Sequence, residues 1–298
     1  MASLSTFRFL KNHPLIVNHK LQALRRFVLW KVSGRLLPCP MAVVLNFVND
    51  TRLIAGPGMV EGNGNICAGL HEFEDMSFVL HLLRKDDVFV DVGANIGSYT
   101  ILAGSVVGAK CLSIEPVPAT FSYLVDNINL NEMGENVQAF NIGAGQEDDV
   151  LSFTTQLDTE NHVATDSDNN VNTVEVPVRP LDDIVGDSEP LCIKIDVEGF
   201  EMAIVEGARD TLTKQSLLAV IMELNGSQER YGYDESALHK SMLSLGFRPF
   251  SYCPFSRELV ALDGKNSRTW NTLYLRDVQQ VSERLRTGPE FRVDGYHI

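Results

Sequence analysis

Residues 88–100, VFVDVGANIGSYT, join an acid to two glycines that lie four positions apart. The apolar run before Asp91 predicts a buried strand, and the residues after Gly97 are expected to begin a helix. Gly93 allows a tight turn and a close backbone approach, while Gly97 lets the helix pack near the strand. Turns at the carboxyl ends of strands are the places where α/β sheets bind ligands.

A second acid, Glu115, follows the apolar run KCLSI at 110–114. A carboxylate there can accept two hydrogen bonds from a ribose diol. The dinucleotide motif G-x-G-x-x-G is incomplete, because Asn95 and Ser98 occupy two of its glycine positions. S-adenosylmethionine needs no pyrophosphate cradle, and its cationic groups suit Asp91. We therefore expect S-adenosylmethionine as the cofactor, with a nicotinamide dinucleotide as the alternative.

The run IKIDVEGFE at 193–201 places Lys194, Asp196 and Glu198 at alternate positions, which share one face of a strand. Charges inside an apolar run are costly unless they are paired or lie at the end of the strand. We expect Asp196 and Glu198 at the mouth of the site, where either contacts the acceptor or accepts its proton. The alternative is a structural network with Lys194, and Glu201 is expected to cap the next helix.

If the acceptor at this site is a hydroxyl, its activation requires a general base or a divalent metal, because a neutral hydroxyl is a poor nucleophile. One candidate base is His162 in DTENHV, for which a solvent-exposed loop histidine is the alternative. The other route uses the oxygen ligands of Asp196, Glu223 and Asn225, a set that suits magnesium. A structural hydrogen bond is the alternative for Glu223, and we assign no residue as a definite metal ligand.

The stretch GLHEFEDM at 69–76 carries His71, Glu72 and Glu74 just before the first strand. It lacks the second histidine of the helical zinc motif, which excludes a metalloprotease of that kind. We expect these residues to organise the entrance of the site.

Short apolar runs alternate with helical stretches from Val88 onward, which predicts a parallel sheet covered on both faces. The expected parallel strands are 88–92, 110–114, 137–142, 191–195 and 218–223, and an antiparallel pair is expected at 247–253 and 272–275. The expected helices are 97–106, 117–131, 199–214 and 234–245. The polar stretch 155–173 is predicted to be a long surface loop.

Before the first of these strands, apolar residues at helical spacing predict a helix over 18–33 with a basic polar face. We expect it to pack on the domain, and weak binding to an anionic membrane surface is the alternative. A hairpin is predicted over 41–56 with its turn at Asn49–Asp50. Residues 56–70 are expected to be irregular, and a helix is expected over 71–85.

The 298-residue chain is 44% hydrophobic, which is enough for a sizeable core. Its net charge of −14 argues against nucleic-acid partners, which require phosphate neutralisation. No apolar run is long enough for a transmembrane span, and we identify no secretory signal. The five cysteines include no C-x-x-C pair, so we expect a reducing cytoplasm, with Cys111 and Cys192 as inert core residues. The oligomeric state is left open.

Five stretches resemble the FkbM-type S-adenosylmethionine-dependent methyltransferases: GLHEFEDM at 69–76, FVDVGANIGSYT at 89–100, IEPVPATFSYLVDNINLN at 114–131, RPLDDIV at 179–185 and IKIDVEGFE at 193–201. The resemblance covers about residues 65–265. It implies the Rossmann-like class I methyltransferase fold, a doubly wound α/β fold with a mostly parallel, seven-stranded sheet. We expect an N-terminal helix and hairpin extension over 1–65, the methyltransferase domain over 66–276 and a C-terminal tail over 277–298.

The resemblance also implies roles for individual residues. The loop of Asp91, Gly93, Asn95 and Gly97 would lie beneath the methionine part of the cofactor, and Glu115 would hold the ribose. The residues near the adenine would be Asn141, Ile142 and Gly143, and the catalytic candidates are Asp196, Glu198 and His162. The implied reaction is O-methylation of a hydroxyl on a sugar, a glycan or a natural product. An NAD-dependent oxidoreductase and a non-catalytic glycan-binding protein with a relic cofactor fold are the alternatives.

Overall fold

The computed structural model describes residues 13–17, 20, 21, 24, 25, 28, 42–56, 59–169, 171–293 and 295–298. Most of the predicted N-terminal helix, 18–33, lies outside these residues. Its five described members are helical. Leu21 is 84% exposed, and Leu24 and Val28 are also exposed. Contrary to the prediction, these three side chains do not pack on the domain.

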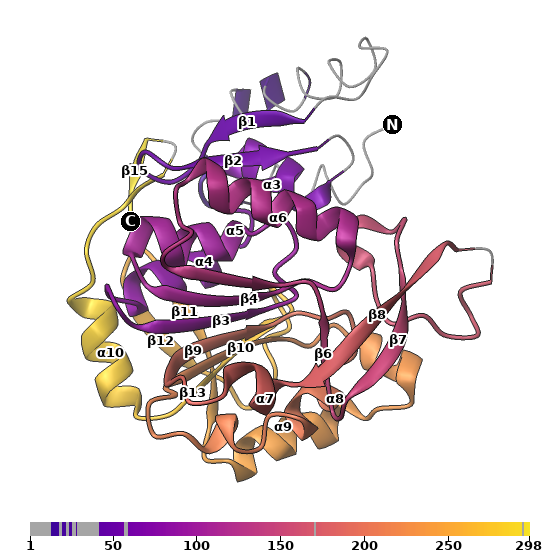
Figure 1. Cartoon of the computed structure of the whole chain (residues 1–298). Helices are drawn as coiled ribbons and strands as arrows, with labels where there is room; N and C mark the ends of the chain where they lie inside the picture. The colour runs from indigo at the N-terminus through magenta and orange to yellow at the C-terminus, as the bar shows by residue number, and fades with distance from the viewer. Residues whose placement is uncertain are drawn as a thin grey trace.

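Eight strands form the main sheet, in the order β12-β11-β13-β10-β9-β3-β4-β5 (Figure 1). Their bounds are β3 Val88–Val92, β4 Lys110–Ile114, β5 Val137–Phe140, β9 Pro190–Ile195, β10 Ala219–Glu223, β11 Arg248–Cys253, β12 Glu258–Ala261 and β13 Asn271–Leu275. The strands from β5 to β10 are parallel, and β13 is antiparallel to both β10 and β11. All seven predicted strands are present, and β12 adds an eighth at the edge.

Helices cover both faces of this sheet, as predicted for a doubly wound fold. Their bounds are α3 Val60–Ala68, α4 Phe73–Leu82, α5 Ser98–Ile101, α6 Pro118–Leu130, α7 Leu181–Val185, α8 Glu201–Glu206, α9 Glu235–Ser244 and α10 Val278–Arg286. A π-helical turn, η1 Leu102–Val107, continues α5. Shorter 3-10 turns lie at η2 Asp158–Glu160, η3 Thr211–Thr213 and η4 Ser227–Tyr231.

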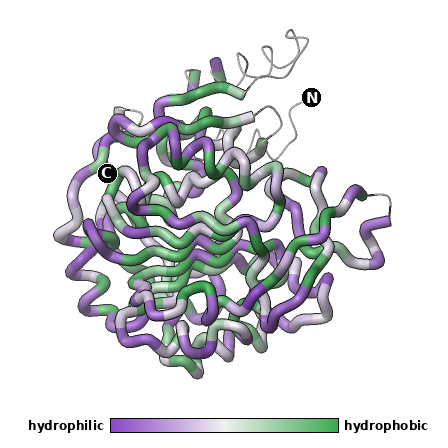
Figure 2. The backbone as a smooth tube through the Cα atoms, viewed as in Figure 1, coloured by the Kyte–Doolittle hydropathy of each residue, from purple (hydrophilic) through white to green (hydrophobic). Residues whose placement is uncertain are grey.

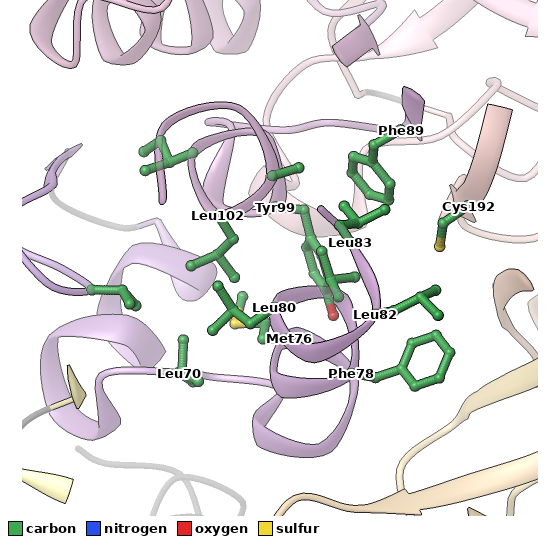
Figure 3. Close-up of a cluster of buried hydrophobic side chains, with 14 of the residues drawn as sticks. Leu70, Met76, Phe78, Leu80, Leu82, Leu83, Phe89, Tyr99, Leu102 and Cys192 are labelled. Atoms are coloured by element: carbon green, nitrogen blue, oxygen red, sulfur yellow. The ribbon is translucent and has the colours of Figure 1, made fainter. Parts of the chain in front are cut away.

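The strands alternate their side chains between two apolar clusters, because successive residues of a strand point to opposite faces. Phe89 of β3 packs with Met76 and Phe78 of α4 on one face (Figure 3). Val90 of β3 packs with Leu238 of α9 on the other face. Both faces of the central strands are therefore buried, and Figure 2 shows hydrophobic residues concentrated along them. This double burial explains the continuous apolar runs in the sequence.

The predicted hairpin is present as β1 Val43–Asn46 and β2 Arg52–Ala55. Asn127 of α6 holds β2 in place, since its Oδ1 accepts the amide of Ile54 at 2.6 Å. The glycine-rich region expected to be irregular instead contains helix α3. That expectation was wrong because Asn65 binds Ser98 at 2.9 Å and Ile66 is buried, so tertiary contacts override the weak helix propensity of the segment.

A second sheet, in the order β6-β8-β7, extends from the main one and was not predicted. Its strands are β6 Gly143–Gly145, β7 Asp149–Thr154 and β8 Thr173–Pro180. The predicted long loop connects β7 to β8 and includes η2. The second sheet therefore fixes both ends of a loop that leads to the carboxyl end of the main sheet (Figure 1).

The residues expected to form a C-terminal tail belong to the folded body. Val281 and Leu285 of α10 are buried in the same cluster as Phe78 of α4. Ile298 and Phe291 exchange backbone hydrogen bonds of 3.0 Å beside β14 Arg292–Val293 and β15 Tyr296–His297. Among the described residues, no helix is both long and apolar enough to span a membrane.

Candidate active site

The site lies where the strand order reverses, between β3 and β9. The chain moves outward in one direction from β3 to β5 and in the other from β9 to β10, so the loops after β3 and β9 separate and leave a crevice. Gly93 brings the two loops together. A Cβ at this position would lie 1.9 Å from the backbone oxygen of Asp196, and its φ is +81°. Only glycine fits at this contact.

One cavity at this crevice is lined by most of the predicted site residues. The lining residues named from the sequence are Asp91, Gly93, Asn95, Glu115, Gly143, His162, Asp196 and Glu198. Gly97, Asn141 and Ile142 do not line it. The Gly97 turn instead makes room for α6, because a Cβ there would lie 2.6 Å from Leu124 Cδ1.

Glu115 forms one wall of the cavity. It is 6% exposed, and its two oxygens accept the amides of Asn95 at 3.0 Å and Val117 at 2.9 Å. Burial raises its pKa to about 7, although both amides favour the charged form. Asn141 supports this loop from behind, since its Nδ2 donates to the backbone oxygens of Glu115 and Pro116. Each oxygen of Glu115 keeps a lone pair for a further donor.

Asp91 lies deeper in the crevice and is 1% exposed. Thr100 Oγ1 donates to its Oδ2 at 2.7 Å, and the same hydroxyl lies 2.8 Å from Ser113 Oγ. Burial raises the pKa of Asp91 to about 6, and Lys194 opposes that rise. The side chain is thus anchored to α5, and it presents negative charge to the base of the cavity.

Lys194 and Asp196 form an ion pair at the end of β9, with 2.6 Å between Nζ and Oδ2. Lys194 is 3% exposed, and its Nζ lies 4.7 Å from the centre of the Tyr99 ring. Burial alone would lower the pKa of Lys194, but the carboxylates of Asp196, Glu72 and Asp91 together raise it. Lys194 is therefore charged, and it keeps a negative charge on Asp196 favourable.

Glu198 and Glu223 join Asp196 in a cluster of three carboxylates. One oxygen from each lies within 4.8 Å of the others. Burial and the neighbouring Asp196 raise the pKa of Glu198 to about 8, and the same two causes raise the pKa of Glu223 well above its ordinary value. Glu198 also adopts a left-handed backbone with φ of 55°, a strained conformation that is concentrated at functional sites.

Glu201 shapes the turn that carries this cluster. Its Oε1 accepts the amides of Val197 and Gly199, and its Oε2 accepts Gln228 Nε2 at 2.9 Å. The predicted capping of the next helix was wrong, because Glu201 is the first residue of α8 and binds the amides of the turn before it rather than those of the helix. Asn225, predicted as a possible magnesium ligand, does not line the cavity. Its Oδ1 accepts the amide of Ser227 at 2.9 Å and stabilises the following turn.

His162 lines the cavity from the loop between β7 and β8, and it is buried rather than solvent-exposed. Its Nδ1 lies 2.7 Å from the backbone oxygen of Glu160, and its Nε2 lies 3.3 Å from Asp168 Oδ1. Both ring nitrogens thus face oxygen acceptors. In this arrangement neither nitrogen presents a free lone pair to an incoming hydroxyl, so the ring orders the loop.

The GLHEFEDM stretch contributes His71 and Glu72 to the cavity lining, as expected of the entrance. Glu72 accepts Tyr99 Oη at 2.8 Å and Asn271 Nδ2 at 2.7 Å. Sequence reasoning missed Tyr99 and Asn271. Asn271 is buried at the start of β13, and a polar residue that opens an apolar run was the signal available for it.

Comparisons with known proteins agree with this arrangement. The Methyltransferase FkbM domain matches residues 91–249, which is more than half of the chain. Methyltransferase 1 from Beauveria bassiana is 31% identical over 162 residues, which are 46% of this chain and 65% of that protein. The hexuronic acid methyltransferase AglP from Haloferax volcanii is 28% identical over 160 residues, 52% of this chain and 62% of its own length. The match thus covers less than two thirds of each relative.

A solved structure also resembles the fold at low similarity. The crystal structure of Pyrococcus horikoshii TYW2 in complex with MeSAdo shares 13% identity and a TM-score of 0.41, covering 84% of this chain and 81% of its own. A similarity of that size carries no weight here. The assignment rests on the domain match over residues 91–249, which also contribute most of the cavity lining, and by this match the chain belongs to the FkbM methyltransferase family.

Proposed function

We propose that this protein transfers the methyl group of S-adenosylmethionine to a hydroxyl oxygen of a sugar, a glycan or a natural product. The observation that carries the proposal is the continuity of one cavity. The cavity connects Glu115, a carboxylate suited to binding the ribose of a nucleoside, with the cluster of Asp196, Glu198 and Glu223. Cofactor and acceptor would therefore meet above the carboxyl ends of β3 and β9.

The cofactor side fits S-adenosylmethionine by its donor and acceptor chemistry. Glu115 has lone pairs left for the two ribose hydroxyls, and Asp91 supplies negative charge for the ammonium and sulfonium groups. When bound, S-adenosylmethionine provides an electrophilic methyl carbon. The Asp196 backbone occupies the Cβ side of Gly93, and Asn95 stands where the dinucleotide motif has its second glycine, so the turn lacks the glycine pair that cradles a pyrophosphate. This disfavours the NAD-dependent alternative.

The acceptor side supplies the base. Asp196 forms an ion pair with Lys194, and Glu198 lies in the same cluster. With the cofactor bound, the acceptor oxygen would attack its methyl carbon as the carbon–sulfur bond breaks, and the hydroxyl proton would pass to a carboxylate oxygen of this cluster. We assign this proton transfer to Asp196, with Glu198 as the second carboxyl in contact with the acceptor. The sulfonium charge disappears in the same step, so charge is balanced.

Magnesium activation is the second route that an observation supports. The three clustered carboxylates offer the hard oxygen ligands that magnesium prefers. Lys194 competes with this role, because its ammonium group already lies 2.6 Å from Asp196 Oδ2. We therefore favour the route through a general base, with His162 as a residue that positions the loop.

The acceptor class draws support from one relative, whose name gives a hexuronic acid as its substrate. The acidic lining of this cavity, however, is poorly suited to an acidic acceptor. Glu72, Asp196, Glu198 and Glu223 face it, and Lys194 is its single Lys or Arg side chain among the described residues. Burial and neighbouring carboxylates raise the pKa of Glu198 and Glu223, and the same two causes would oppose a carboxylate on the acceptor. We therefore favour a neutral hydroxylated acceptor over a uronate.

The test is methyl transfer from labelled S-adenosylmethionine to a panel of neutral glycosides, uronic acids, oligosaccharides and hydroxylated metabolites. Wild-type protein is expected to label a neutral hydroxyl compound, and Asp196→Asn is expected to abolish that labelling while still binding the cofactor. Labelling of an amine or a carbon acceptor alone would contradict O-methylation. Cofactor binding by neither protein would contradict the proposal as a whole.

A further inference from the structure

An exposed tryptophan lies at the same end of the main sheet as the carboxylate cluster. Trp270 directly precedes β13, whose first residue, Asn271, pairs with Glu223 at the end of β10. The backbone oxygen of Trp270 accepts the amide of Leu224 at 2.8 Å. Its side chain is 51% exposed, and it is not part of the cavity lining. The ring thus lies outside the cavity, beside a strand end that carries a cavity residue.

The backbone of Trp270 is strained. Its φ of 67° falls in the left-handed region, which a bulky side chain rarely adopts. Such conformations persist where the surrounding structure imposes them, and they are concentrated at ligand-binding sites. A glycine or an asparagine would adopt this backbone conformation with less strain. The backbone geometry therefore does not explain why a tryptophan occupies position 270.

The ring is also held in place. Lys265 Nζ lies 6.0 Å from the ring centre, and the same ammonium group is fixed by Glu235 at 2.5 Å and by the Leu224 backbone oxygen at 3.2 Å. Two more hydrogen bonds order the loop, since Asn266 binds both Thr269 and Thr272. The loop that carries the half-exposed ring is therefore ordered, which lowers the loop entropy lost when a ligand stacks on the ring.

We propose that Trp270 forms a second acceptor subsite, which stacks against a sugar ring next to the one that is methylated. The face of a pyranose is a patch of C–H groups, and the negative face of an indole attracts such groups as it attracts cations. Because the ring lies outside the cavity, the acceptor must extend beyond it. The acceptor is therefore an oligosaccharide or a glycoside of at least two rings. This inference rests on the proposed function.

The experiment compares one-ring and multi-ring carbohydrates in the methyl-transfer assay, using methyl glycosides and the matching di- and trisaccharides. Trp270→Ala should raise KM for the longer acceptors at least tenfold and leave KM for the single-ring acceptor and the affinity for S-adenosylmethionine unchanged. Trp270→Phe should restore most of the loss. Val260→Ala, which removes exposed apolar surface from β12, is the control and should behave as wild type.

A direct binding readout uses the chain's two tryptophans, Trp30 and Trp270. In a Trp30→Phe variant, the remaining fluorescence reports Trp270 alone. It should shift when the acceptor trisaccharide identified in that assay is added and stay constant with the one-ring glycoside. Unchanged KM in Trp270→Ala, or an unshifted spectrum, would overturn the second subsite while methyl transfer itself stands. Methylation of one-ring acceptors alone, or of no carbohydrate, would also overturn the second subsite. If S-adenosylmethionine still binds in that case, the subsite has failed while the cofactor part of the proposed function stands.

Discussion

Replacing Glu115 should weaken the binding of S-adenosylmethionine in a way that depends on pH. In Glu115→Ala the ribose loses its charged acceptor, and hydrogen bonds to a charged group contribute about 1.5–3 kcal/mol. That range corresponds to roughly a tenfold to hundredfold loss of affinity. The variant also leaves the Asn95 and Val117 amides without their carboxylate partner, so the loss should fall in the upper part of the range.

The pH dependence follows from the raised pKa of Glu115, which is about 7. A carboxyl of this pKa is roughly one-tenth ionised at pH 6 and nine-tenths ionised at pH 8. Only the ionised form accepts hydrogen bonds at both oxygens, so wild-type affinity should rise between these two pH values. Glu115→Gln keeps the shape of the side chain but does not titrate, so its affinity should be lower and nearly constant.

Isothermal titration calorimetry with S-adenosylmethionine at pH 6 and pH 8 measures both effects. Circular dichroism and the melting temperature of each variant provide the check on folding. Unchanged affinity in a folded Glu115→Ala protein would refute the ribose assignment. A Glu115→Gln variant that keeps the wild-type pH dependence would show that another group causes it.

Four further predictions follow from the site. Asp196→Asn should reduce kcat by at least about 10² with less than a threefold change in cofactor affinity, and a matching loss of affinity would place Asp196 on the cofactor side instead. His162→Ala should raise the acceptor KM and lower kcat by less than tenfold, because both ring nitrogens face oxygen acceptors; a fall of about 10²–10⁴ would restore it as the general base. Treatment with EDTA should leave turnover unchanged, whereas magnesium-dependent turnover that is lost in Glu223→Gln would establish the metal route. Gly93→Ala should destabilise the fold by at least about 2 kcal/mol, since its Cβ would lie 1.9 Å from the Asp196 oxygen; an unchanged melting temperature would contradict this contact.

The sequence predicted the main sheet well because its strands are buried on both faces. Runs such as 88–92 and 191–195 are apolar except for Asp91 and Lys194, so the signal of a buried strand is nearly unbroken. The second sheet was missed for the opposite reason. Its strand β8 carries two prolines, Pro177 and Pro180, and alternates exposed with buried residues, so it lacks such a run. Helix α3 was missed because packing rather than propensity stabilises its glycine-containing sequence.

The sequence predicted those residues of the candidate site that directly follow a strand. Glu115 and Asp196 directly follow strands that are readable from the sequence, and they line the same cavity. The partners of Glu72 could not be predicted, because Asn271 lies 199 residues away and Tyr99 lies on a different element. The arrangement of His162 depends on Asp168 in the same polar loop, which has no periodic pattern.

The measurement that tests the central claim most directly is a calorimetric titration of the full-length protein with S-adenosylmethionine and, separately, with NAD. The arrangement of Glu115, Asp91 and the closely packed turn at Gly93 predicts saturable binding of S-adenosylmethionine and no binding of NAD. Binding of NAD without binding of S-adenosylmethionine would contradict the assignment and favour an oxidoreductase. Binding of neither compound would leave a fold without its cofactor and contradict methyl transfer altogether.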